Sequence, residues 1–171
     1  MNLILTSSGF MNFSTGEIYR ELQEELLKKT VALKKRTIGL IYTARQPDDW
    51  KWLDFYDKEL KTLGFPYDVI NISEALNITS LPEYDIYYVC GGNTFYVLDR
   101  LRKTGMDTVL QSAVGKGKLY IGVSAGSIIA GPDISTSGFG GDLADTNDVH
   151  LVDLTGFSWV PFHLSPHFTS E

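Results

Sequence analysis

A five-residue run past the middle of the chain has the spacing of a catalytic serine turn. Gly122-Val123-Ser124-Ala125-Gly126 matches the G-x-S-x-G nucleophile elbow, in which a sharp strand-to-helix turn exposes a serine hydroxyl above a sheet. The two glycines leave room where the strand folds back against the helix. The helix directs its amino end, and the Ala125 N–H, toward a developing oxyanion. The pattern predicts Ser124 as a nucleophile; the alternative is an ordinary turn of small residues.

A second glycine-bearing turn, Gly91-Gly92-Asn93, follows another apolar run. The Gly92 N–H could supply a second oxyanion donor, because glycine lets the backbone approach a reacting carbonyl closely. An ordinary strand-to-helix turn is again the alternative. Cys90 precedes this turn at the end of a predicted buried strand, with no histidine near it in the sequence. We therefore interpret Cys90 as a structural cysteine and not as a nucleophile.

A serine hydroxyl needs a base within hydrogen-bond reach and a third group that orients the base. Three histidines compete for the role of base, namely His150, His163 and His167. Four acids crowd the region after the elbow, namely Asp142, Asp145, Asp148 and Asp153. Residue spacing alone does not choose among either set.

Short apolar runs alternate with amphipathic stretches, which is typical of a parallel α/β sheet. Strands are predicted near residues 3–5, 37–42, 67–72, 84–89 and 119–123. Helices are predicted from a capping box at residues 14–17, from near Asp48-Asp49 to Gly64, and from about Thr94. Both glycine-bearing turns follow strands, and the carboxyl ends of parallel strands are where sites gather.

Composition narrows the class of protein. A length of 171 residues with 43% hydrophobic and 21% charged residues predicts a single globular domain spanning 1–171. The net charge of −6 argues against a nucleic-acid partner, and no apolar stretch approaches the length of a membrane span. One cysteine and three histidines suggest no disulfide, metal or cofactor. The first residues do not resemble a targeting signal, so a cytoplasmic location is expected.

The chain resembles the aspartyl dipeptidases of the dipeptidase E family. Residues 89–95, Val-Cys-Gly-Gly-Asn-Thr-Phe, are similar to that family's glycine-rich strand end, and residues 119–126 are similar to its elbow. Thr146-Asn147-Asp148 and Ser165-Pro166-His167-Phe168-Thr169 resemble two further family segments in the expected order. The resemblance spans nearly the whole chain.

This resemblance implies roles for individual residues. Ser124 would be the nucleophile, His167 the base and Asp148 the orienting acid, with the N–H groups of Gly92 and Ala125 as the oxyanion hole. It also implies a three-layer, flavodoxin-like, mostly parallel sheet with helices on both faces, as in class I glutamine amidotransferases. The implied activity is hydrolysis of short peptides through an acyl-enzyme, with a preference for aspartate at the amino terminus. No cofactor is implied, and a homodimer is left open.

The chain departs from the family pattern in three places. Family members continue for several tens of residues after the histidine segment, so we expect residues 1–171 to lack the carboxyl-terminal part usual in the family. The loop at residues 134–145 is longer than in a bacterial dipeptidase of this family. Val123 stands where that enzyme has an aromatic residue directly before the serine. An inactive peptide-binding or regulatory domain is therefore the alternative function. A glutamine amidotransferase would instead carry cysteine at position 124.

Overall fold

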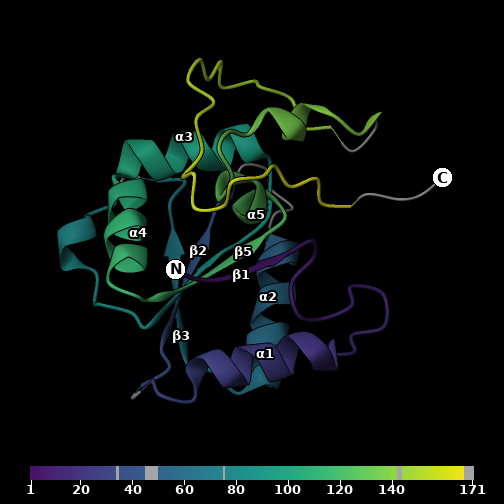
Figure 1. Cartoon of the computed structure of the whole chain (residues 1–171), viewed down its shortest axis with the longest axis vertical. Helices are drawn as coiled ribbons and strands as arrows, with labels where there is room; N and C mark the ends of the chain where they lie inside the picture. Colours follow the sequence, from purple (N-terminus) through teal and green to yellow (C-terminus); the bar gives the residue numbers. More distant parts are fainter. Residues whose placement is uncertain (34, 45–49, 75, 142–143, 168–171) are drawn as a thin grey trace.

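In the described part of the chain, five parallel strands form one sheet in a computed structural model (Figure 1). The structure describes residues 1–33, 35–44, 50–74, 76–141 and 144–167. The strands are β1 (Asn2–Thr6), β2 (Ile38–Tyr42), β3 (Tyr67–Asn71), β4 (Ile86–Val89) and β5 (Leu119–Val123). Their order across the sheet is β1-β5-β4-β2-β3, and every neighbouring pair is parallel.

The central strands are apolar along their whole length because both faces of the sheet are covered. Every residue of β2, β4 and β5 is buried. Edge strand β3 is more open, and Val69 is 46% exposed. The burial patterns therefore explain why the central strands read as continuous apolar runs.

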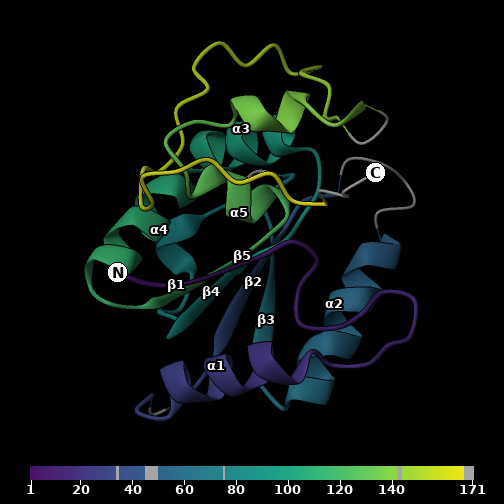
Figure 2. The same ribbon diagram turned by 45° about the vertical axis from the view of Figure 1, so that its right-hand side comes forward.

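Helices form the two outer layers of the molecule (Figures 1 and 2). One face of the sheet packs against α1 (Arg20–Thr30) and α2 (Trp50–Leu63), through Leu26 and Leu60 among others. The other face packs against α3 (Thr94–Thr104), α4 (Met106–Gly115) and α5 (Ala125–Ile129). Single 3₁₀ turns occupy Ile78–Ser80 and Ser135–Gly138. This architecture confirms the predicted three-layer α/β class with a parallel sheet.

Most predicted element bounds agree with the structure within two residues, but the first helix does not. The residues of the predicted capping box form a turn, because the Asn12 side chain accepts the Ser14 and Thr15 N–H groups at 2.9 and 3.0 Å. Met11 also bridges to Ile18, so α1 begins only at Arg20. The predicted start of the second helix at Asp48-Asp49 lies outside the described residues.

Residues 144–167 have no long helix or strand and cross the face of the molecule that carries α3 and α5 (Figure 2). Backbone hydrogen bonds join Phe157 N to Ile129 O at 2.8 Å and Trp159 N to Ala130 O at 2.9 Å. The Trp159 ring packs edge-on against buried Tyr120, with ring centroids 4.8 Å apart. These contacts hold the segment over α5 and direct its end toward the carboxyl end of β1.

Candidate active site

The turn between β5 and α5 has the strained backbone of a nucleophile elbow. Ser124 has φ 48° and ψ −108°, a combination that non-glycine residues rarely adopt. A Cβ atom at Gly122 would lie 2.6 Å from the Gly126 carbonyl oxygen, and one at Gly126 would lie 2.5 Å from the Val89 carbonyl oxygen. Both glycines are therefore required sterically, which is the reason predicted from the sequence.

Strand β1 holds the elbow from the other side. The Ser124 N–H donates to Thr6 O at 3.0 Å. The buried Ser127 hydroxyl accepts the Thr6 N–H at 3.0 Å and lies 2.7 Å from the carbonyl oxygens of both Thr6 and Gly122. These bonds connect the end of β1 to the first turn of α5, so residues that follow β1 are positioned relative to Ser124.

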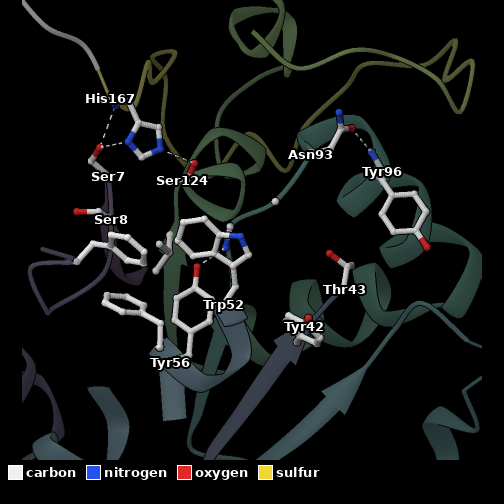
Figure 3. A pocket seen from close by; sticks show the side chains of 15 residues that line it. Ser7, Ser8, Tyr42, Thr43, Trp52, Tyr56, Asn93, Tyr96, Ser124 and His167 are labelled. Carbon is white, nitrogen blue, oxygen red and sulfur yellow. Dashed lines mark hydrogen bonds between the residues drawn. The ribbon is translucent and has the colours of Figure 1, made fainter. Parts of the chain in front are cut away.

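His167 lies between two serines at this edge of the sheet (Figure 3). Its Nε2 atom is 3.0 Å from Ser124 Oγ, and its Nδ1 atom is 3.3 Å from Ser7 Oγ. The His167 backbone N–H also donates to Ser7 Oγ at 2.9 Å. A hydroxyl oxygen can accept two hydrogen bonds, so Ser7 can hold the tautomer with its proton on Nδ1. In that tautomer Nε2 is free to accept the Ser124 proton.

Asp148, the acid expected to orient His167, is exposed, and its carboxylate accepts a hydrogen bond from Thr146 Oγ1 at 3.1 Å. His167 Nδ1 contacts the Ser7 hydroxyl. Asp145 has another task, because its carboxylate accepts both the N–H and the hydroxyl of Thr94 at the start of α3. The role of Asp148 therefore stays a prediction.

The other two histidines lie elsewhere. His163 Nε2 is 2.9 Å from Asp133 Oδ2, and hydrogen bonds from Ser135, followed by this contact with His163, lower the pKa of Asp133 to about 2. The His150 N–H donates to Asn147 O in an exposed turn. Only His167, of the three, lies at the elbow.

Gly92 and Ala125 are placed at the carboxyl ends of neighbouring strands β4 and β5. Gly92 has φ 141°, which favours glycine. Among the described residues, neither its N–H nor that of Ala125 donates to a protein acceptor. The adjacent Gly91 N–H instead donates to the Tyr56 hydroxyl at 3.0 Å. Two N–H groups that lie beside a candidate nucleophile and have no acceptor among the described residues could donate hydrogen bonds to an oxyanion.

Cys90 is 1% exposed and lies at the end of β4. Burial raises the pKa of its thiol well above the usual value, with a smaller contribution from Glu59. A neutral, enclosed thiol is a poor nucleophile, which agrees with its interpretation as a structural residue.

Ser124 and His167 line a cleft with a volume of about 520 Å³ (Figure 3). The ends of β1, β2, β4 and β5 supply one part of its lining, including Ser7, Thr43 and Gly92. The turn after β1 and the start of α2 supply aromatic side chains, namely Phe13, Trp52, Phe55 and Tyr56.

The described residues include no cluster of histidine, cysteine or acid that could hold a metal. None of the described helices has the length and apolar character that a membrane span requires.

Sequence reasoning missed Ser7 and the aromatic lining. A run of small residues, Thr6-Ser7-Ser8-Gly9, follows the first apolar strand directly. The same pattern follows the strands before Gly91 and before Ser124. The aromatic residues lie on two separate segments of the sequence, and they form one surface only where the loop after β1 meets α2.

A strained serine on a strand-to-helix turn, in contact with a histidine at the carboxyl edge of a parallel sheet, defines an α/β protein of the nucleophile-elbow class. The model of peptidase family S51 matches residues 3–171. The chain therefore belongs to peptidase family S51.

Individual relatives agree with this assignment. An uncharacterized peptidase of Listeria monocytogenes, Lmo0363, is 33% identical over 181 residues, covering 99% of this chain and 78% of that protein. Peptidase E of Citrobacter koseri is 36% identical over 125 residues, covering 70% of this chain and 50% of that protein. The chain thus spans about half the length of that enzyme.

Solved structures have the same fold. A candidate peptidase E protein from Listeria monocytogenes EGD-e matches with a TM-score of 0.73 at 30% identity, covering 95% of this chain and 76% of that one. A peptidase from an acI-B1 actinobacterium matches with a TM-score of 0.64 at 18% identity, covering 92% and 64% of the two chains. The second likeness concerns the fold alone.

Proposed function

We propose that this protein is a serine peptidase that hydrolyses short peptides through an acyl-enzyme on Ser124. The observation that carries the proposal is the 3.0 Å contact between Ser124 Oγ and His167 Nε2 on a strained elbow. Membership of peptidase family S51 supports the reaction class. The two N–H groups of Gly92 and Ala125 support the same chemistry, because they can stabilise a tetrahedral oxyanion.

In this mechanism Ser124 Oγ attacks the peptide carbonyl carbon while His167 Nε2 takes the hydroxyl proton. The carbonyl oxygen becomes an oxyanion that accepts hydrogen bonds from Gly92 and Ala125. When the intermediate collapses, the C–N bond breaks and His167 gives its proton to the departing amine. Water then attacks the acyl-enzyme with His167 as base, which releases the acid and restores Ser124.

Two residues, Asp148 and Ser7, are candidates for the third member of the triad. Family resemblance favours Asp148, whereas the contact at Nδ1 favours Ser7. A carboxylate stabilises the imidazolium that forms during attack, and a neutral hydroxyl orients the ring but contributes less charge stabilisation. The two assignments therefore differ in how much activity each side chain supports.

A fluorophosphonate probe tests the nucleophile, because it labels only an activated serine. We expect the wild-type protein to gain one covalent adduct by intact mass, and Ser124→Ala to gain none. His167→Ala is expected to slow labelling at least about 10²-fold, since the base is lost. Equal labelling of Ser124→Ala would reject this nucleophile. No adduct on the wild-type protein would favour the inactive binding domain.

Several finer expectations stay predictions from the sequence. They are the preference for aspartate at the amino terminus, the cytoplasmic location, the homodimer, and the single domain that lacks a carboxyl-terminal part. A dipeptide panel tests the substrate preference, and fractionation of the source cells tests the location. Sedimentation analysis tests the homodimer, and the encoded reading frame tests the extent of the domain.

A further inference from the structure

Three aromatic side chains form a cluster at the surface beside the candidate active site. The Phe13 ring centroid lies 5.2 Å from that of Trp52 and 5.4 Å from that of Phe55. Phe13 is nevertheless 65% exposed and Trp52 is 49% exposed. Aromatic rings usually bury most of their area, so a cluster left open in a concave site marks a surface that binds an apolar group.

The cluster lies in the cleft that contains Ser124 and His167 (Figure 3). Tyr56 continues the aromatic wall inward, and its oxygen already accepts the Gly91 N–H. No Lys, Arg, Asp or Glu is present among the described residues that line the cleft. The described wall therefore offers contact area to an apolar side chain but no cation to an acidic one.

The wall is held in place before any ligand arrives. Phe13 sits in a turn whose preceding residue, Asn12, accepts two backbone N–H groups through its side chain. Buried Glu59 of α2 accepts the Phe10 and Met11 N–H groups at 2.7 and 2.9 Å, which joins the same loop to the helix that carries Trp52. A preformed wall costs little ordering entropy on binding.

We infer that the Phe13–Trp52–Phe55 wall is a specificity subsite for a large apolar side chain, aromatic or branched aliphatic, of the peptide substrate. The inference rests on the proposed function, because it places this side chain next to the bond that Ser124 would cleave. It adds an apolar requirement at one residue of the substrate, and it leaves open a separate preference at the other.

Binding to Ser124→Ala tests the subsite without turnover. Calorimetric titration with Phe-Ala, Ala-Phe, Asp-Ala and Ala-Ala is expected to show at least one phenylalanine dipeptide binding about tenfold or more tighter than Ala-Ala, as burial of an aromatic side chain implies. Adding Trp52→Ala or Phe13→Ala should remove most of that difference. Phe139→Ala, which truncates a 70% exposed phenylalanine outside the cleft, should leave it unchanged.

The outcomes separate the subsite from the proposed reaction. Equal affinity for all four dipeptides, or a preference that survives both wall variants, overturns the subsite even if the fluorophosphonate probe labels Ser124. Apolar preference in Ser124→Ala together with no hydrolysis by the wild-type protein supports the subsite and overturns the peptidase reaction. With turnover, kcat/KM of the wild-type protein should follow the same order as the affinities.

Discussion

Ser7 joins the last described residue of the chain to its first strand. Its oxygen accepts the His167 N–H at 2.9 Å and lies 3.3 Å from Nδ1 of the same residue. His167 has φ 61° and an exposed side chain. The Ser7 hydroxyl contacts Nδ1, so we propose that Ser7 is a positioning residue that orients the imidazole toward Ser124.

Ser7→Ala is expected to lower kcat roughly tenfold with little change in KM, because it frees the imidazole without altering the aromatic wall. Steady-state kinetics on a cleaved dipeptide measures this split. Ser7→Thr keeps the hydroxyl and should recover much of the activity, and Ser8→Ala, in the same cleft, is the matched control. A rise in KM at unchanged kcat would assign Ser7 to substrate binding instead.

The Asp148→Asn variant tests the other assignment, in which Asp148 orients His167. If the carboxylate orients His167 when substrate is bound, kcat falls at least about 10²-fold, as expected for loss of a triad acid. The loss would then exceed that of Ser7→Ala. Activity within about threefold of wild type would remove Asp148 from the triad and leave Ser7 at Nδ1. Circular dichroism of both variants checks that the fold is kept.

The elbow shows two opposing effects at one glycine of α5. Alanine favours a helix over glycine by about 1 kcal/mol. At Gly126, however, the added methyl group would lie 2.5 Å from the Val89 carbonyl oxygen, which belongs to the neighbouring strand. Backbone atoms in a buried sheet cannot withdraw easily, so the steric cost exceeds the gain in helix propensity.

Gly126→Ala should therefore destabilise the protein by roughly 1–3 kcal/mol or more, measured as the free energy of unfolding in urea. Gly115→Ala is the matched control, since Gly115 ends α4 and its added Cβ would have no neighbour within 4 Å. That control is expected to be neutral or stabilising by up to about 1 kcal/mol. Similar losses in both variants would contradict the steric explanation.

Three parts of the molecule meet at the buried Glu59 of α2. Its side chain accepts the Phe10 and Met11 N–H groups from the loop after β1 and the Tyr88 hydroxyl, at 2.6 Å, from β4. Burial raises the pKa of this carboxyl group, against the smaller lowering effect of its hydrogen bonds. The folded state therefore favours the protonated form more strongly than the unfolded chain does.

Because the pKa is higher in the folded state, Glu59 contributes most to stability below its unfolded pKa, and that contribution is lost as pH rises through its folded pKa. Urea unfolding of wild type and Glu59→Gln between about pH 4 and pH 8 compares the two. The free energy of unfolding of wild type minus that of Glu59→Gln should fall as pH rises. A difference that grows with pH would show that the carboxylate is favoured in the folded state.

Local patterns in the sequence determined the layers of this protein and its elbow. Continuous apolar runs predicted the central strands because both faces of the sheet are covered, and the two glycines around Ser124 predicted a turn that only small residues permit. The predicted start of α1 was wrong because the Asn12 side chain accepts the Ser14 and Thr15 N–H groups. The Ser14 N–H is the group that the Glu17 side chain would accept in a capping box.

Family resemblance named Ser124 and His167 as a pair, but the contacts between distant groups, including the contact of Ser7 with His167, were decided by the tertiary structure. Ser7 and His167 are 160 positions apart in the sequence, and Ser124 and His167 are 43 apart, so no local pattern could pair them. Phe13 and Trp52 likewise form one wall only after the loop that follows β1 packs on α2. Periodicity and turn chemistry act over a few neighbouring residues, whereas the candidate active site forms from chain segments that the packing of the core brings together.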